Sequence, residues 1–207
     1  MNIVLQRGVS VSLFQSVYKT SELYKPTNRN LWGWLNAIFN RVDNDRRKQV
    51  GPDRACAEWL LRCGASVKWQ NFNHWVKDYN TLPGSNFKNY QIEEIDASDS
   101  AVMAVGFPHL EGLKHVKRIT LHNCGYLDDS ALSYLPCVKD SLIYLQLSSC
   151  GDISNQGLQP IQQLKNLKRL KMFDLPEVRN MPAVIDDLQK KLPECTIEYI
   201  PEKKKGE

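Results

Sequence analysis

The side chains of this chain that could carry catalysis are few, and their spacing does not suit it. His74 and Asp78 stand four residues apart, which on a helix indicates a surface pair rather than an acid–base site. His122 and Cys124 are two apart on a predicted strand, but Gly125 favours a turn there, so the two side chains are not expected to share one face as a catalytic Cys–His pair must. The chain has no phosphate-binding loop, no glycine-rich dinucleotide motif and no His-Glu-x-x-His zinc motif. The sequence therefore predicts a protein that is not an enzyme and has no small-molecule substrate.

The pattern between residues 95 and 178 points instead to a repeated structural unit. Residues 119–127 and 145–153 both read apolar-x-Leu-x-x-Cys-Gly-x-apolar, and residues 170–178 carry Leu175 where the other copies have Cys. A degenerate first copy precedes them. The anchors Ile95, Ile119, Leu145 and Leu170 are 24, 26 and 25 residues apart. This spacing is typical of leucine-rich repeats, so the predicted fold is an α/β solenoid of about four repeats with short parallel strands and an N-terminal helical cap.

Alternation within each predicted strand indicates which side chains face outward. These positions form columns across neighbouring strands, which lie about 4.8 Å apart, so Glu94 is expected to pair with Arg118. Two interpretations of this face remain open: a solvated surface, or a surface that docks a protein partner. The predicted partner-binding residues are Glu94, Asp96, Arg118, Thr120, His122, Tyr144, Gln146, Arg169, Lys171 and Phe173.

Composition places mild limits on the partner. The 207 residues are 42% hydrophobic and carry a net charge of +4, which allows a proper core in one or two domains. The basic residues do not form the dense stripe expected of a nucleic-acid binder, and no apolar run approaches the roughly 18 residues needed to cross a bilayer. The six cysteines include no Cys-x-x-Cys pair, so zinc is not expected. Cys124 and Cys150 fit inward repeat positions, which favours a reducing compartment.

The chain divides into segments of different character. The predicted segments are a mitochondrial transit peptide at 1–28, a helical domain at 29–66, repeats with a closing strand at 67–200, and a disordered tail at 201–207. The transit peptide is inferred because Arg7 and Lys19 occur before the first acidic residue, Glu22, in a Ser-rich amphipathic stretch. An ordinary disordered tail is the alternative for these residues.

The helical domain opens with a Trp-rich apolar stripe from Leu31 to Val42, and the charged residues 43–48 are expected to follow as its last stretch. Pro52 then favours the start of a second helix, which Gly64 ends. The stripe either packs on the first repeat as a cap, or lies partly on a membrane surface or a partner.

Stretches in both halves of the chain are similar to one known family. They are residues 31–40, 50–55, 58–65, 95–100, 109–113 and 149–151. Together they resemble coupling factor B, the s subunit of mitochondrial ATP synthase, from residue 31 to the last repeat. The resemblance implies a protein without catalytic activity of its own, peripheral to the matrix side of the inner mitochondrial membrane. It also implies association with the membrane sector of ATP synthase and a role in proton-coupled ATP synthesis.

Two other functions remain open. A related family with the same repeats comprises assembly factors for the distal membrane arm of respiratory complex I, so assembly intermediates of complex I are alternative partners. Cysteine-bearing repeats also occur in F-box adaptors of ubiquitin ligases. Those adaptors need a trio of F-box helices, which the Trp-rich segment does not resemble.

The resemblance further implies a magnesium ion between the helical domain and the repeats, at the positions of Gly64 and Ser98. Glycine can offer only its backbone carbonyl, which suits an ion that takes oxygen ligands and keeps several waters. Asp96 could add negative charge nearby. A plain helix end and a strand serine are the alternative for these two positions. The family also carries two thiols two residues apart in the second repeat; this chain has His122-Asn123-Cys124 there, which puts a dithiol role in doubt.

Overall fold

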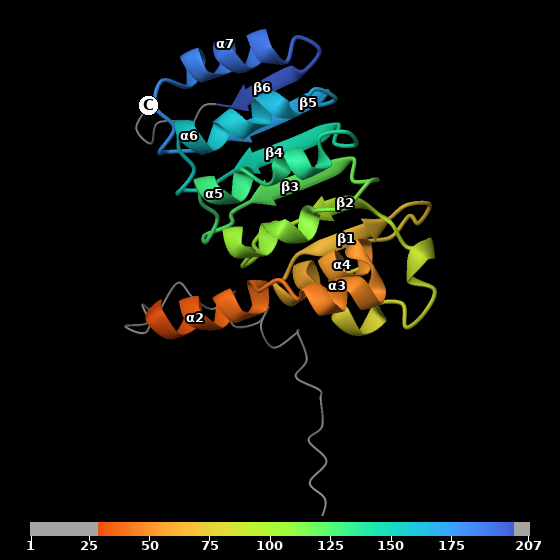
Figure 1. Cartoon of the computed structure of the whole chain (residues 1–207). Coiled ribbons are helices and arrows are strands. Elements are labelled where there is room, and N and C mark those ends of the chain that lie inside the picture. Colours follow the sequence, from red (N-terminus) through yellow and green to blue (C-terminus); the bar gives the residue numbers. More distant parts are fainter. Residues whose placement is uncertain (1–28, 201–207) are drawn as a thin grey trace, which may run out of the picture.

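A six-stranded sheet runs through the part of the chain that the computed structural model describes, residues 29–200 (Figure 1). The strands follow chain order, with β1 antiparallel to β2 and all later neighbours parallel. They are β1 (Ser66–Trp69), β2 (Ile92–Asp96), β3 (Arg118–His122), β4 (Tyr144–Ser148), β5 (Arg169–Phe173) and β6 (Thr196–Ile200). The closing strand predicted at 196–200 is confirmed as β6. The predicted transit peptide and tail lie outside the described residues.

The register between the strands confirms the spacing read from the sequence. Ile95 pairs with Ile119, Ile119 with Leu145, and Leu145 with Leu170, so the anchors of the four copies lie side by side. The unit is therefore an α/β arrangement in which each copy supplies one parallel strand and a helical return.

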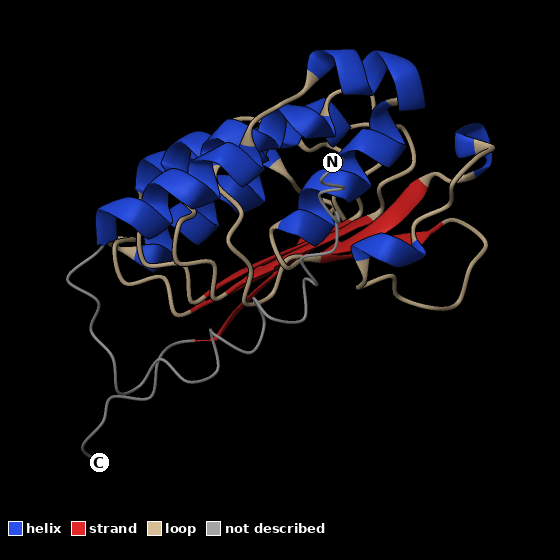
Figure 2. Cartoon of the chain, turned by 90° about the horizontal axis from the view of Figure 1, so that it is seen from below, coloured by secondary structure: helices blue, strands red, loops and turns tan. Residues whose placement is uncertain are grey.

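Helical segments cover one face of the sheet (Figure 2). They are α2 (Arg29–Asn40), α3 (Asn44–Val50), α4 (Pro52–Arg62), α5 (Asp129–Leu132), α6 (Asn155–Leu158) and α7 (Met181–Lys191), with the 3-10 segments η3 (Ala104–Leu110), η4 (Leu135–Val138) and η5 (Gln159–Gln163). Two further 3-10 segments, η1 (Tyr79–Thr81) and η2 (Phe87–Asn89), belong to the connection between β1 and β2. Because every second strand residue points to the helical side, that side holds the core and the other side stays open.

The core is one continuous apolar cluster from α4 to the last strand. It includes Trp59 of α4, Trp69 of β1 and the inward strand residues of each copy, such as Leu147. Cys124 and Cys150 are 1% and 0% exposed, which confirms their predicted role in packing. All six cysteines carry free thiols.

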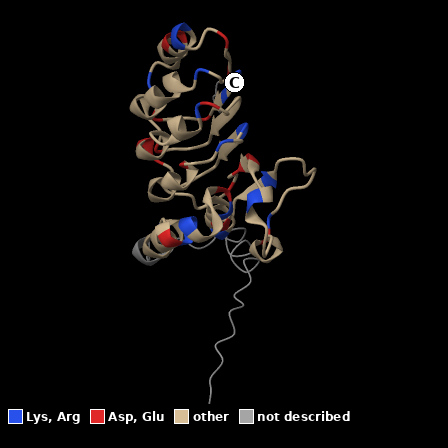
Figure 3. Ribbon diagram, turned by 45° about the vertical axis from the view of Figure 1, so that its right-hand side comes forward, with Lys and Arg blue, Asp and Glu red and all other residues tan. Residues whose placement is uncertain are grey.

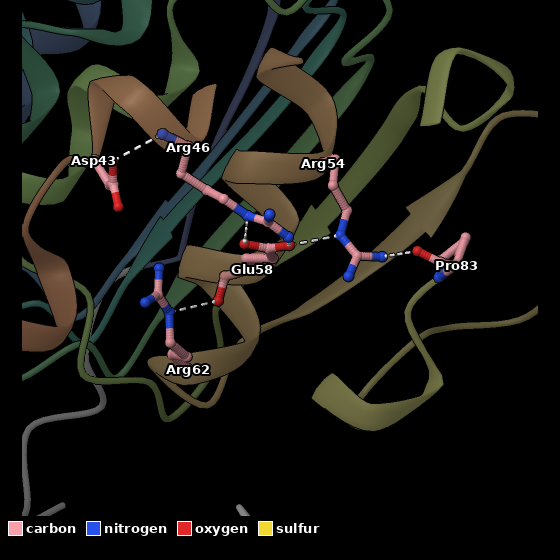
Figure 4. Close-up of polar contacts among 6 residues, drawn as sticks. All are labelled: Asp43, Arg46, Arg54, Glu58, Arg62 and Pro83. Atoms are coloured by element: carbon pink, nitrogen blue, oxygen red, sulfur yellow. Dashed lines mark hydrogen bonds and ion pairs between the residues drawn. The ribbon is translucent and has the colours of Figure 1, made fainter. Parts of the chain in front are cut away.

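The buried carboxylate of Glu58 ties the N-terminal helices together (Figure 4). Asp43 caps α3 by accepting a hydrogen bond from the backbone N–H of Arg46. The Arg46 guanidinium donates to Glu58 of α4 at 2.7 and 3.0 Å, and Arg54 donates to the same carboxylate at 2.7 Å. Burial raises the pKa of Glu58, but these hydrogen bonds outweigh burial and hold that pKa below its ordinary value.

The cap α2 differs from the prediction in two respects. Phe39 packs on the core, but Trp34 and Ile38 are 60% and 48% exposed, so the apolar stripe covers the first repeat only in part. The expectation that charged residues extend this helix is wrong: α2 ends at Asn40 and a separate helix starts at Asn44. The physical reason is the Asp43 side chain, which satisfies a free N–H at the start of a new helix.

Between residues 29 and 200, none of the helices has the length and apolar character needed to cross a membrane.

Candidate functional site

A connected set of polar and aromatic side chains covers the open face of the sheet. Glu94 on β2 lies between two cations: Lys68 Nζ on β1 at 2.9 Å and Arg118 Nε on β3 at 3.1 Å. The predicted Glu94–Arg118 pair is thereby confirmed. The Arg118 guanidinium also lies over the Tyr144 ring on β4, 4.0 Å from its centroid. These contacts hold Arg118 in one orientation, although each partly exposed ion pair contributes only up to about 1 kcal/mol.

The set continues along β4 by hydrogen bonds. The Tyr144 hydroxyl donates to Gln146 Oε1 at 3.0 Å, and Gln146 Nε2 donates to Ser148 Oγ at 3.0 Å. Ser148 Oγ also lies 2.9 Å from Nδ1 of His122 on β3. Since Ser148 Oγ already accepts from Gln146, its own hydrogen is available for His122 Nδ1, which favours the tautomer protonated on Nε2.

Aromatic contacts extend the set to β5. The His122 and Phe173 rings lie 5.8 Å apart, and the Lys171 ammonium lies 5.4 Å from the Phe173 centroid. At the far edge, Arg169 pairs with Glu198 of β6 at 3.3 Å. These contacts link side chains from β1 to β5, and the Arg169–Glu198 pair separately joins β5 to β6; we call all of these residues the open-face array.

The register brings the predicted partner-binding residues together in the expected columns. In the first column, Arg118 pairs with Tyr144 and Tyr144 with Arg169. The second column consists of Asp96, Thr120, Gln146 and Lys171. In the third column, His122 and Phe173 flank Ser148. Two members of the array, Lys68 and Glu198, were missed from the sequence, and Ser148, expected at an exposed position, is fully buried. Ser148 already stands in the predicted column with His122. Lys68 could be found only once β1 is known to run antiparallel to β2, which places it opposite Glu94.

Ser148 and His122 are the only Ser–His pair in hydrogen-bond contact among the described residues of the array. Ser148 and His122 could suggest a nucleophile and its base, but the Ser148 side chain is fully buried and is shared with Gln146. No carboxylate orients the His122 ring among the contacts of the described residues, whereas a catalytic base usually has such a third group. The arrangement favours a preorganised binding surface.

The predicted magnesium ligands lie at the end of the β1–β2 pair. The antiparallel pairing ends with Ser66 opposite Asp96; Gly64 lies two residues before this pair in the chain, and Ser98 two residues after it. The Ser98 hydroxyl donates to Asp96 Oδ1 at 2.6 Å, which leaves its oxygen lone pairs available. Gly64 has a φ of +85° after the end of α4, as expected of a left-handed helix end.

The donor set at this position fits a hard cation but supplies little charge. A carbonyl, a hydroxyl and one carboxylate are oxygen ligands of the kind magnesium takes, with waters completing its shell. Over residues 29–200 there is no group of three or more His, Cys, Asp or Glu side chains that could hold a metal ion. Magnesium at Gly64 and Ser98 therefore stays a prediction.

Cys124 and Cys150 form a buried pair of thiols whose pKa values shift in opposite directions, because the hydrogen bond with Cys124 lowers the pKa of Cys150 to about 7. A hydrogen bond with Cys150 and burial both raise the pKa of Cys124, so this thiol stays protonated at neutral pH. Its sulfur also lies 3.0 Å from the Ala97 carbonyl. His122, the last residue of β3, stands two residues before Cys124. A pair of thiols two residues apart is therefore absent at this position, as the sequence indicates.

Comparison with known proteins gives a consistent set of relatives. No family model matches the chain. The protein named ATP synthase subunit s, mitochondrial, from Homo sapiens is 45% identical over 169 residues, which cover 80% of this chain and 84% of the relative. The protein of that name from Bos taurus is 43% identical over the same coverage. Distal membrane arm assembly component 2 from Drosophila melanogaster is 23% identical over 205 residues, covering 90% of this chain and 72% of the relative.

Proposed function

Because this chain belongs to the family of mitochondrial ATP synthase subunit s, we propose that it is a non-catalytic protein that associates with ATP synthase in mitochondria. We place it on the matrix side of the inner membrane, at the membrane sector of the enzyme, where it supports proton-coupled ATP synthesis. We further propose that its architecture is a leucine-rich-repeat solenoid, since four sequence copies 24 to 26 residues apart align as neighbouring strands.

The open-face array is the observation that supports docking on a protein partner. Arg118 and Tyr144 are residue types that dominate the energetics of protein interfaces, and here they are held in place by their neighbours before any partner binds. Side chains that are already ordered lose less entropy on binding. The described helices from α3 to α7 lie on the other side of the sheet from the array (Figure 2).

Co-purification from mitochondria tests this proposal. A tagged chain is expected to bring down ATP synthase, and replacing Arg118, Tyr144 and Arg169 together by Ala is expected to remove it. The matched control replaces Arg62, Tyr126 and Arg179 by Ala, three exposed residues of the same types outside the array. The proposal fails if the array variant retains ATP synthase as well as the control does.

Complex I assembly is a second candidate function, supported by the 23% identity to distal membrane arm assembly component 2 over 90% of this chain. Native gels of mitochondria depleted of the protein distinguish the two. Loss or uncoupling of ATP synthase is expected from the leading proposal, whereas loss of the distal arm of complex I alone would favour this second one.

We also propose that magnesium binds through the Gly64 carbonyl and the Ser98 hydroxyl, with Asp96 supplying charge. The ion would tie α4 to β2 and so stabilise the folded state by mass action. Millimolar Mg²⁺ is then expected to raise the thermal midpoint of unfolding of the full chain, and Asp96→Asn to abolish that rise. Asp99→Asn is the matched control, because Asp99 accepts a hydrogen bond from Asn123 instead of facing Ser98. An equal response in both variants would contradict the site.

A further inference from the structure

The turns at the two ends of the parallel strands carry opposite charge. Counted with the adjoining helix residue, the turns into β3, β4, β5 and β6 contain six basic and three acidic residues: Lys114, Lys117, Lys139, Lys165, Lys168 and Lys191 against Glu111, Asp140 and Glu194. The turns out of β2, β3, β4 and β5 contain six acidic residues and one basic residue: Asp99, Asp128, Asp129, Asp152, Asp174 and Glu177 against Arg179. Because the strands are parallel and in register, the turns into the strands lie at one end of the strands and the turns out of them at the other. Figure 3 marks the basic residues in blue and the acidic residues in red. We call the six lysines the basic rim.

Most of the charge on the basic rim is not compensated. Lys117 pairs with Glu93 at 2.6 Å, and Lys168 approaches Glu194 at 3.8 Å. The other four lysines (Lys114, Lys139, Lys165 and Lys191) make no ion pair with any residue from 29 to 200. All six lysines are exposed, so the rim presents a line of positive charge to solvent.

An exposed apolar side chain lies in the middle of this line. The backbone N–H of Ile143 donates to the Lys117 carbonyl at 2.9 Å, and the N–H of Lys168 donates to the Ile143 carbonyl at 2.9 Å. Ile143 is therefore flanked by lysines on both neighbouring strands. It is 44% exposed, although Leu142 before it and Leu145, two residues after it, are fully buried.

We propose that the basic rim binds the surface of a bilayer that contains anionic lipids, with Ile143 entering the boundary between head groups and acyl chains. This inference rests on the proposed function for its location at a membrane and adds the surface that makes the contact. Flexible lysines suit a diffuse layer of negative head groups better than a site that demands fixed bidentate geometry. An apolar side chain among cations gains from partial burial at such a boundary.

Two features of the rim favour lipid over the other anionic macromolecules. Its turns contain no Phe, Tyr or Trp, the side chains on which the bases of single-stranded nucleic acids stack. The apolar Ile143 at its centre has no role in purely electrostatic binding of an acidic protein. Since the rim is an edge of the sheet, its contact with a membrane leaves the open-face array accessible to a membrane-bound partner.

Vesicle sedimentation with the purified full chain tests the proposal. Binding is expected to phosphatidylcholine vesicles that contain phosphatidylglycerol, to weaken with salt, and to be far weaker to pure phosphatidylcholine vesicles. Changing Lys139, Lys165 and Lys168 to Gln should reduce affinity on the order of a hundredfold, because each cation near an anionic surface contributes about a factor of five. The matched control removes three charges elsewhere: Lys48→Gln, Arg62→Gln and Arg179→Gln should change affinity much less.

Ile143→Ser separates the lipid proposal from simple charge attraction. It should reduce vesicle affinity a few-fold at both low and high salt, since the apolar contact is not screened. Equal losses in the two triple variants, or no vesicle binding at all, would overturn the assignment. Tight binding of polyglutamate together with no effect of Ile143→Ser would overturn it in favour of an acidic protein partner. The assay contains only lipid and this chain, so its outcome does not depend on whether ATP synthase co-purifies.

Discussion

His109 shows how burial at a single residue controls charge in this protein. It lies in η3, is 2% exposed, and stacks on Trp59 with ring centroids 5.3 Å apart and planes 13° apart. The backbone of Arg41 is close, yet neither ring nitrogen makes a hydrogen bond of normal geometry. Burial, together with the nearby cations Arg47 and Arg62, lowers the pKa of His109 from its ordinary 6.5 to about 4. The ring is therefore neutral in the folded state.

Stability is expected to fall as the pH drops from about 6.5 to about 4. In this window the unfolded chain binds a proton at His109 and the folded chain does not, so protonation favours unfolding. A shift from 6.5 to about 4 corresponds to roughly 3 kcal/mol at the acidic end of the window. The free energy of unfolding, measured by urea titration at pH 7, 5.5 and 4.5, tests this prediction.

His109→Phe is the control for this pH dependence, because it keeps an aromatic ring against Trp59 and removes the titrating group. The free energy of unfolding of the variant should change much less between pH 7 and 5. Glu58 also titrates abnormally, but its pKa is lowered, so its contribution is lost only at more acidic pH. Parallel pH curves for the wild-type chain and the variant would show that His109 is not the cause.

At the scale of elements, α2 is attached to the body largely through one side chain. Asn40 Nδ2 donates to the carbonyls of Asn36 and Ala101 at 2.8 and 2.9 Å. Asn40 Oδ1 accepts from Trp59 Nε1 at 2.9 Å and from the backbone N–H of Met103 at 2.8 Å. A fully buried amide thus joins α2, α4 and the turn before η3. This polar anchor explains why the apolar residues Trp34 and Ile38 can stay on the outer side of the helix.

Asn40→Ala should cost about 3 kcal/mol of stability, because it leaves the Trp59 and Met103 N–H groups buried without acceptors. It should also free α2, so that trypsin cleaves after Arg41 faster than in the wild-type chain while the rest of the fold persists. Asn36→Ala is the matched control. The Asn36 amide nitrogen is buried without a partner, so its removal should cost little. Equal cleavage rates in both variants would contradict the anchor.

At the scale of the whole molecule, the continuous core predicts a single unfolding transition. The buried cluster runs without interruption from Cys56 of α4 to Cys195 beside the last strand. Neighbouring strands and helices share this one core, so unfolding of one part exposes the apolar surface of the next. The N-terminal helices and the sheet should therefore lose structure together.

Leu145→Ala tests this cooperativity from the middle of the sheet. Leu145 is fully buried, so the change should cost about 3 kcal/mol. Trp59 and Trp69 lie at the other end of the core. The urea midpoint measured by tryptophan fluorescence should therefore fall by as much as the urea midpoint measured by circular dichroism. Ile143→Ala, two residues away and exposed, should shift both by less than about 0.5 kcal/mol. A tryptophan signal that keeps the wild-type midpoint would show that the N-terminal part unfolds separately.

The local geometry of strands and turns was readable from the sequence by itself. Side chains alternate along a strand with a period of two, and copies of nearly equal length stack in register. The column of Glu94, Arg118 and Tyr144 and the inward place of Cys124 and Cys150 follow from these rules, and Pro52 indicated the start of a helix. The sequence of residues 31–40, 50–55 and 58–65 also indicated the family of ATP synthase subunit s.

Only the tertiary structure decided which distant groups meet. Lys68 reaches Glu94 because β1 runs antiparallel to β2. The buried Ser148 hydroxyl contacts His122 because the two residues are register partners on β4 and β3. Which face of α2 turns inward depends on the hydrogen bonds of Asn40 with Trp59 of α4 and with Met103 just before η3. The spacing of apolar residues along α2 does not reveal these partners. The basic rim exists because parallel strands bring every turn of one kind to the same edge. Contacts of this sort depend on chain direction and packing between elements, whereas sequence patterns carry only the geometry within each element.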